Sequence, residues 1–399
     1  MTSCCKYNGF QISDTFPQVE VDYSFFQFPS FNTGKAIKSF TFEIMFKTSI
    51  AQFSIYPGYW LAFVLFYLTT GLFSCKEKAG VKNVERSLYY WKSVVKPTDF
   101  ELKRLASLNV QTIYLKFFDV DWEPSSKQAI PVAKMQAANQ RLFKQYKIIP
   151  TVFITNECIQ QIDSTQCIAL AGKINGLIKA LCQVNQINPI KEIQIDCDWT
   201  VSTTKKYFML LNAIHQLSQT NLSATIRLHQ IKFFSKTGVP PVNRGLLMCY
   251  NMGNLKNPAT KNSIIETDEL KKYTANLSNY PLPLDIAFPL FGWKVLFRDQ
   301  IYKGLIENLP ENIFTPSFSN QKNGRIEILK DTLLAGYDLK KGDMLRLENS
   351  DISTILAVAK EVNRHLKNTK FRVSLYQLDS ITLKKYTTHD LESIYNSLH

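Results

Sequence analysis

The sequence predicts an α/β protein that folds as a (β/α)8 barrel, also called a TIM barrel. Eight short runs of apolar and β-branched residues recur between residues 86 and 378, mostly separated by stretches with helical apolar spacing. This alternation is typical of a parallel sheet with crossover helices. A doubly wound open sheet is the competing architecture, but it usually ends after about five or six strands. Residues 291–350 are irregular and rich in Gly, Asn and Lys, which predicts an insertion after the seventh strand.

The individual elements follow from the apolar period and from the residues at the ends of each run. The expected strands cover residues 86–91, 111–117, 147–154, 192–198, 223–230, 245–252, 284–290 and 372–378. The expected helices cover residues 98–108, 131–146, 167–184, 205–218, 267–277, 351–366 and 390–399. Thr98 is expected to be an N-cap, because its hydroxyl can accept from a free backbone N–H of the first turn.

An apolar segment without charged residues, Gly58–Cys75, precedes the predicted barrel and is followed by Lys-Glu-Lys. It has the length of a secretory signal and is short for a spanning helix. Its ending, LFSC, resembles the lipobox of bacterial lipoproteins, in which the cysteine becomes the lipidated N-terminus. An uncleaved membrane anchor that ends by chance in cysteine is the alternative.

These features divide the chain into four segments. We expect a non-native or disordered extension at 1–44, a lipoprotein signal peptide at 45–75 ending at Cys75, a linker at 76–85 and the barrel at 86–399. The expected location is the bacterial cell envelope, at the periplasmic or outer face, with a lipid anchor in a membrane. The protein is expected to be a monomer.

The charge and the cysteines exclude several classes of function. Net charge is +14, but the lysines are scattered as isolated pairs, so we expect no nucleic-acid partner. The basic balance could instead hold the barrel on anionic lipid or polymer. Beyond Cys75 the cysteines are sparse and odd in number, which argues against a disulfide framework. Cys158 and Cys167 could form a bridge or remain free thiols.

No motif predicts a cofactor or a metal. The first strand is not followed by G-x-G-x-x-G, and the sequence contains no Walker loop and no G-x-S-x-G elbow. The acidic run at Asp119 and Asp121 lacks the ligand spacing of an EF-hand loop. These two carboxylates are expected in a solvated loop. We therefore expect neither a metal nor a cofactor.

Polar and aromatic side chains collect at the ends of the expected strands, where the active site of such a barrel lies. Asp196 and Asp198 lie one residue apart, so alternation places them on one face of their strand, and the same reasoning pairs Arg227 with His229. Buried carboxylates are costly unless they are paired or used, so the alternative is an ion pair with Arg227 or Lys116. The candidate site residues are Trp91, Lys116, Asp196, Asp198, Trp199, Arg227, His229, Tyr250, Asn251, Trp293 and Tyr376. Rings and carboxylates together suit a sugar ligand.

Four segments in order resemble motifs of the family 18 glycoside hydrolases, which are chitinase-like barrels. EIQIDCDWT is similar to the strand-four D-x-x-D-x-D-x-E pattern, and LLMCYNMG is similar to the strand-six M-x-Y-D. IAFPLFGW resembles the strand-seven G-x-P-x-Y-G, and SLYQLD resembles the strand-eight segment, where a tryptophan usually stands. The resemblance implies a glycan substrate that contains N-acetyl sugars.

The resemblance leaves two registers for the acidic strand. One puts Thr200 where the family has its acid, and the other makes Asp198 the acid with Gln194 in place of an aspartate. The leading hypothesis is a glycoside hydrolase in which Asp198 is the general acid, Asp196 and Tyr250 orient the substrate, and the remaining candidates bind it. The alternative is a non-catalytic glycan-binding lipoprotein on a degenerate hydrolase barrel.

Overall fold

A computed structural model of the protein describes residues 82–307 and 309–398. The expected segments 1–44 and 45–75, with Cys75, lie outside the described residues. Of the expected linker at 76–85, the described part enters the first strand at Asn83, which is earlier than expected.

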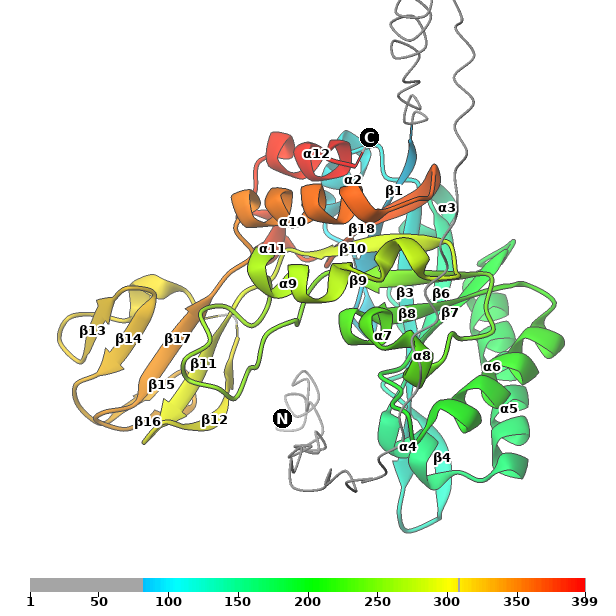
Figure 1. Ribbon diagram of the computed structural model, residues 1–399, viewed down its shortest axis with the longest axis horizontal. Helices are drawn as coiled ribbons and strands as arrows, with labels where there is room; N and C mark the ends of the chain where they lie inside the picture. The colour runs from blue at the N-terminus through cyan, green and yellow to red at the C-terminus, as the bar shows by residue number, and fades with distance from the viewer. Residues whose placement is uncertain (1–81, 308, 399) are drawn as a thin grey trace, which may run out of the picture. The chain divides into compact units, whose positions relative to one another are not determined.

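Eight parallel strands close into a barrel, as predicted (Figure 1). The hydrogen-bonded order around the barrel is β1, β3, β6, β7, β8, β9, β10 and β18, and β18 pairs again with β1. The strands are β1 (Asn83–Tyr90), β3 (Thr112–Glu123), β6 (Lys147–Ile154), β7 (Glu192–Asp196), β8 (Asn221–Arg227), β9 (Arg244–Met248), β10 (Leu284–Pro289) and β18 (Lys370–Tyr376). Closure occurs between β1 and β3, where Tyr89 lies opposite Tyr114.

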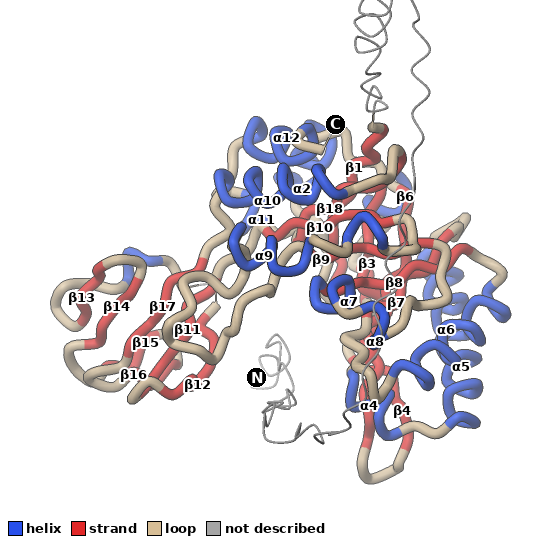
Figure 2. The backbone as a smooth tube through the Cα atoms, in the orientation of Figure 1, coloured by secondary structure: helices blue, strands red, loops and turns tan. Residues whose placement is uncertain are grey.

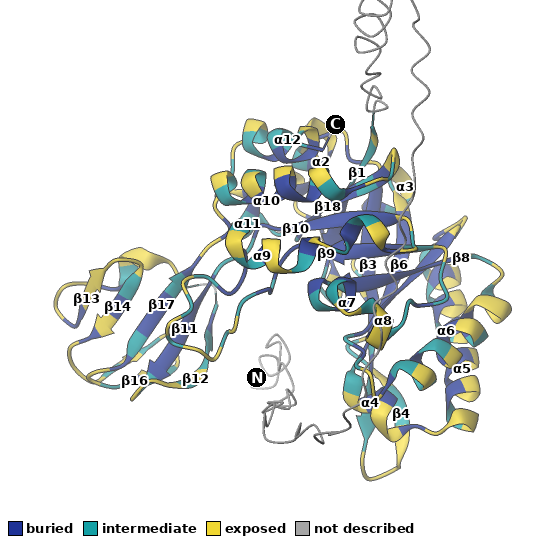
Figure 3. Ribbon diagram, viewed as in Figure 1, coloured by how far each residue is buried: buried dark blue, intermediate teal, exposed yellow. Residues whose placement is uncertain are grey.

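Helices cover the outside of the barrel, each with one buried and one exposed side (Figures 2 and 3). They are α2 (Asp99–Ser107), α4 (Asn156–Gln161), α5 (Ser164–Asn185), α6 (Thr204–Ser218), α7 (Leu228–Lys232), α8 (Phe234–Thr237), α9 (Thr267–Thr274), α10 (Ile352–His365), α11 (Ser380–Leu383) and α12 (Thr388–Asn396). The predicted cap of α2 is confirmed, because Thr98 Oγ1 accepts from Glu101 N at 3.2 Å. By length and composition alone α5 could cross a membrane, but it buries Leu170, Ile174 and Ile178 against the barrel.

The prediction of a helix at residues 131–146 is wrong. That segment forms β4 (Gln128–Val132), the two-residue β5 (Gln136–Ala137) and only a short α3 (Arg141–Gln145). β4 pairs antiparallel with the far end of β3, from Asp119 to Glu123. The apolar spacing suited a helix, but strand pairing supplies the backbone hydrogen bonds, and Pro131 is tolerated on this edge.

A polar cluster fills the barrel near the N-terminal ends of its strands. Arg372 Nη1 lies 2.8 Å from Glu192 Oε2 and 3.4 Å from Asp285 Oδ2. Arg244 Nη1 reaches the same oxygen of Asp285 at 3.2 Å. Burial raises the pKa of Asp285 to about 6, although both arginines oppose that shift. The buried carboxylates at this end therefore depend on the guanidinium groups beside them.

The middle of the barrel is aromatic and hydrogen-bonded. Tyr89 donates its hydroxyl across the interior to Gln194 Oε1 at 2.5 Å, which joins β1 to β7. The ring of Tyr89 stacks on Tyr114, with ring centroids 4.8 Å apart. Both side chains are buried, and the ring of Tyr89 also contacts Trp91 and Tyr376.

The insertion after the seventh barrel strand is an antiparallel sheet with its own apolar core. Its strands, in the order β12, β11, β17, β14, β13, are Ile301–Ile306, Trp293–Arg298, Met344–Glu348, Arg325–Ile328 and Ser319–Lys322. A separate hairpin joins β15 (Thr332–Leu334) to β16 (Tyr337–Leu339). Leu296, Ile326 and Leu345 contribute to the core. The chain then returns through α10 to β18.

Removing the buried guanidinium at the polar end of the barrel should destabilise the fold strongly. Arg372→Met leaves Glu192 and Asp285 with less compensating charge, and we expect a loss of about 3–5 kcal/mol in unfolding free energy. Urea denaturation followed by circular dichroism measures it. Arg141→Met is the matched control, because Arg141 pairs with Asp99 on the surface and should cost less than about 1 kcal/mol. Equal losses would contradict the assignment of Arg372 to this role.

Candidate functional site

The C-terminal ends of the eight strands form the mouth of the barrel, and β7 ends there with the two aspartates. Asp196 is the last residue of β7, faces the interior and is 4% exposed. Thr225 of β8 donates to its Oδ1 at 2.6 Å. Burial, reinforced by the charge of Asp198, raises the pKa of Asp196 to about 7. This carboxyl group can therefore carry a proton near neutral pH.

Asp198 lies beyond the strand, and its side chain is 44% exposed. Arg227 holds it from β8 in a two-pronged ion pair, with Nε to Oδ1 at 2.5 Å and Nη2 to Oδ2 at 2.8 Å. Since both oxygens accept from the same guanidinium, the side chain of Asp198 has a fixed direction. The two aspartates thus differ in depth and in partner.

His229 lies near this ion pair, although not on the same strand. β8 ends at Arg227 and α7 begins at Leu228, so the expected alternation of Arg227 with His229 along one strand is wrong. Gln230 Oε1 accepts from the backbone N–H of Arg227 at 2.8 Å, which starts the helix early. Burial and the charge of Arg227 lower the pKa of His229, while Asp198 acts in the opposite direction.

Aromatic side chains from four parts of the chain meet at the mouth. The ring of Tyr376 lies 5.6 Å from Tyr250 and 6.0 Å from Trp91, measured between centroids. Phe291, which follows β10, lies 5.8 Å from Tyr376 and 5.9 Å from Tyr250. Trp91 and Phe291 remain partly exposed, whereas Tyr250 and Tyr376 are buried. Trp91, Tyr250, Phe291 and Tyr376 are called the aromatic group below.

The third carboxylate of the mouth, Asp119, was expected in a solvated loop. Asp119 instead lies within β3. The pairing of β3 with β6 shifts register between Lys116 and Phe118. This bulge turns Asp119 to the same side as Phe153 and Asp196, its neighbours along β6 and β7. Burial raises the pKa of Asp119, and the charge of Asp119 in turn raises that of Asp196.

Lys116 connects this acidic side of the mouth to the aromatic group. Its Nζ lies 2.7 Å from Asp119 Oδ2 and 5.6 Å from the centroid of the Trp91 ring. The register shift leaves Phe117, between Lys116 and Phe118, without a partner in the pairing of β3 with β6.

Two of the expected site residues are buried in the core, although the ring of Trp293 lies 5.2 Å from that of Phe291 in the aromatic group. Trp199 is fully buried behind β7, where its Nε1 donates to Thr237 O at 3.0 Å and its ring stacks on Tyr207. Trp293 begins the insertion, and its Nε1 donates to Glu348 Oε2 at 2.6 Å. Both indoles are core residues, so neither offers a free face to a ligand. Periodicity alone does not distinguish such a tryptophan from one at the mouth.

Several buried polar atoms at the mouth have no hydrogen-bond partner among the described residues. They are Asp119 Oδ1, Tyr250 OH and Asn251 Oδ1. Burial raises the pKa of Tyr250 well above its usual value, so the hydroxyl keeps its proton. An unpaired buried polar group is costly, which makes these atoms ready partners for water or a ligand.

Within residues 82–307 and 309–398 the structure gives little support for a metal site or a reactive thiol. That part of the chain contains no group of His, Cys, Asp or Glu side chains able to hold a metal ion. Cys158 and Cys167, whose pairing was left open, are both buried free thiols. Burial raises the pKa of Cys158 to about 12, so its thiol is a poor nucleophile at neutral pH.

Comparison with known proteins finds similarity at the level of structure only. No protein-family model matches the sequence, and no curated protein matches it. A chitinase from Chromobacterium violaceum shares 10% identity, with 79% of this chain and 98% of that chain covered and a TM-score of 0.46. The spore cortex-lytic enzyme SleL of Bacillus cereus shares 11%, covering 80% and 75%, with a TM-score of 0.49. For a chitinase from Bacteroides thetaiotaomicron the values are 11%, 80%, 95% and 0.46. Such weak similarity carries no evidence of a shared activity.

The raised pKa of Asp196 makes a prediction about stability. The folded protein holds this proton up to about pH 7, whereas the unfolded chain loses it near pH 4, so stability falls as pH rises through that window. Asp196→Asn keeps the acceptor for Thr225 and removes the titration. We expect the loss of unfolding free energy between pH 5 and pH 8 to shrink by on the order of 2 kcal/mol.

Denaturant titrations at the two pH values measure this difference. Asp268→Asn is the control and should leave the pH dependence between pH 5 and pH 8 unchanged, because a hydrogen bond and the charge of Lys271 lower the pKa of this exposed side chain. Asp119 and Asp285 still titrate in the Asp196→Asn variant, so some slope remains. An unchanged slope in that variant would contradict the assignment.

Proposed function

We propose that the mouth of the barrel binds a glycan. The observation that carries this proposal is the contiguity of the aromatic group with two charged pairs, Arg227–Asp198 and Lys116–Asp119. Partly exposed rings stack on the apolar faces of sugars, and fixed charges bind their hydroxyl groups. The motifs at β7, β9, β10 and β18 that resemble family 18 hydrolases support the same class of ligand.

We further infer that the chain binds this glycan without the hydrolysis that the resemblance implies. Thr200 stands at the position of the acid, and its carbonyl accepts from Thr203 N and Thr204 N, both at 3.0 Å, in the turn that starts α6. A threonine hydroxyl cannot serve as a carboxylic acid. In the alternative register the acid is Asp198, but Arg227 occupies both of its oxygens. Neither register supplies a carboxyl group that is free to give a proton to a ligand.

Hydrolysis with a different acid is the second candidate, and one observation favours it. Asp196 has a pKa raised to about 7, which suits a group that gives up a proton at neutral pH. The burial of Asp196 argues against this candidate, because the residue is 4% exposed and accepts a hydrogen bond from Thr225. A ligand would have to enter below the level of Asp198 to reach it.

The proposed place of action is the bacterial cell envelope. The proposal rests on the lipobox-like LFSC at Leu72–Cys75, with Cys75 as the lipidated residue. We expect the protein expressed in a bacterium to incorporate labelled palmitate and to fractionate with membranes. Cys75→Ser should abolish the label, whereas Cys158→Ser, which changes a buried thiol of the barrel, should retain it. Palmitate incorporation that survives Cys75→Ser would refute the lipoprotein assignment.

Calorimetric titration with soluble oligosaccharides of bacterial and host origin tests the binding proposal. Trp91→Ala should weaken binding about tenfold, because it removes a partly exposed ring of the aromatic group. Tyr146→Ala removes a partly exposed ring where β6 begins, at the opposite end of the barrel, and should leave affinity unchanged. Equal effects of the two variants would contradict a site at the mouth.

Product analysis in the same titrations separates the two candidates. Binding without shortened oligosaccharides supports the binding protein. Shortened products that disappear in Asp196→Asn support the second candidate. Products that persist in both Asp196→Asn and Asp198→Asn would contradict both assignments.

A further inference from the structure

The outer surface of α5 and α6 carries charge of one sign. The lysines on these helices are Lys173, Lys179, Lys205 and Lys206, and neither helix contains Asp or Glu. Within the described part of the chain, none of these lysines forms an ion pair; Lys206 donates to Gln160 O. Helix α9 differs, because Lys271 and Lys272 pair with Asp268 and Glu269. The lysines of α5 and α6 therefore give these two helices a net positive charge, although Asp163, the N-cap of α5, lies beside them.

Large apolar side chains are exposed on the same two helices. Ile168 and Val184 of α5 are 58% and 77% exposed, and Met209 and Leu217 of α6 are 37% and 49% exposed. The two helices lie side by side on the barrel (Figures 1 and 2). The outer surface of α5 and α6, with these lysines and apolar side chains, is called the cationic face below.

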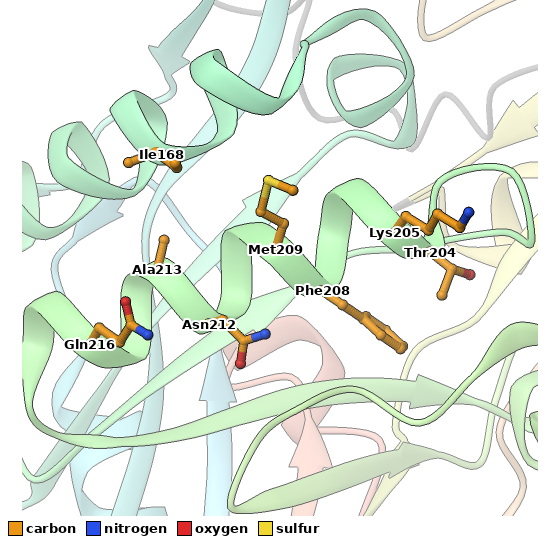
Figure 4. A pocket seen from close by; sticks show the side chains of 8 residues that line it. All are labelled: Ile168, Thr204, Lys205, Phe208, Met209, Asn212, Ala213 and Gln216. Atoms are coloured by element: carbon orange, nitrogen blue, oxygen red, sulfur yellow. The ribbon is translucent and has the colours of Figure 1, made fainter.

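A shallow groove of about 540 Å³ runs along the cationic face (Figure 4). Ile168 lines it from α5, and Phe208, Met209 and Ala213 line it from α6. Lys205 lies at one end, and Asn212 and Gln216 complete the wall. The groove is mainly apolar, lies outside the barrel and contains no residue of the mouth, so the proposed glycan site does not account for it.

The lysines and the exposed apolar side chains of the cationic face together indicate what kind of partner fits it. A soluble polyanion satisfies lysines but offers no apolar surface to Ile168 and Met209. The interface of an anionic bilayer offers phosphate groups for the lysines and acyl chains for the apolar side chains. A polar surface of mixed charge on another protein fits neither feature.

We propose that the cationic face docks on an anionic lipid bilayer. The lysines attract the surface through its negative potential, and the apolar side chains enter the boundary between headgroups and acyl chains. This contact uses residues of α5 and α6 and is independent of any lipid attached to Cys75. It is also independent of the glycan proposal, because no residue is shared.

Vesicle sedimentation with the full-length protein tests this proposal. The vesicles contain phosphatidylcholine alone or phosphatidylcholine mixed with phosphatidylglycerol. The combined Lys173→Gln, Lys179→Gln, Lys205→Gln and Lys206→Gln variant should lose about tenfold or more in partitioning to the anionic vesicles. Added salt should reduce partitioning of the wild-type protein much more than that of this variant.

The matched control removes the same charge in the insertion, by Lys303→Gln, Lys322→Gln, Lys330→Gln and Lys341→Gln, all at exposed positions. Because both proteins keep the same N-terminal segment, any contribution of that segment to binding is common to them. Equal partitioning of the two variants would overturn the proposal. All substituted lysines are exposed or half-buried, so we expect the circular dichroism spectrum to remain that of the wild type.

A second variant tests the apolar part of the contact. Ile168→Gln with Met209→Gln should lower partitioning to anionic vesicles several-fold and leave its salt dependence unchanged. If this variant binds like the wild type, and soluble polyphosphate binds the lysines equally well, the face is a polyanion site and the proposal fails. It fails too if sedimentation shows a wild-type dimer that this variant dissociates, because a second copy then covers the face.

Discussion

Closure of the sheet between β1 and β3 is the constraint on which the rest of this structure depends. It encloses side chains from strands far apart in sequence, and every polar group among them needs a partner inside the barrel. Arg372 forms ion pairs with Glu192 and Asp285 at one end, and Gln194 accepts a hydrogen bond from Tyr89 in the middle. At the other end Tyr250 and Asp119 retain buried polar atoms without a partner among the described residues, as Gln194 Nε2 and Arg372 Nε do deeper in the barrel.

The two aspartates of β7 illustrate how position along a strand decides chemistry. Asp196 remains inside the barrel, where burial favours its neutral form. Asp198, one pleat further, reaches the exposed end and meets the guanidinium of Arg227. A pair that looks equivalent in the sequence therefore consists of one buried carboxyl group with a raised pKa and one carboxyl group fixed in an ion pair. This difference is the basis on which we propose binding without hydrolysis.

Sequence patterns predicted the fold well because they report on burial, and burial determines which segments become barrel strands. The eight strands, the insertion after β10 and the cap at Thr98 all follow from local residue types. The site was predicted less completely because it depends on where a strand deviates from regular alternation. The bulge beside Phe117 directs Asp119 inward, and the early start of α7 moves His229 off its strand. Trp199 and Trp293 are of the residue type expected to stack on a ligand. In the folded protein they contact Tyr207 and Glu348 instead, and the sequence pattern does not predict these contacts.

Tyr89 stabilises the interior of the barrel and also contacts the aromatic group. Its hydroxyl is bonded across the barrel to Gln194, and its ring lies 5.9 Å from Trp91 and 5.6 Å from Tyr376. A change at Tyr89 would therefore disturb both the centre of the barrel and the aromatic group. Under the proposed function, a change of sugar specificity would have to keep Tyr89 or rebuild the centre of the barrel. Phe291 is the more accessible position for such a change, because its ring is partly exposed.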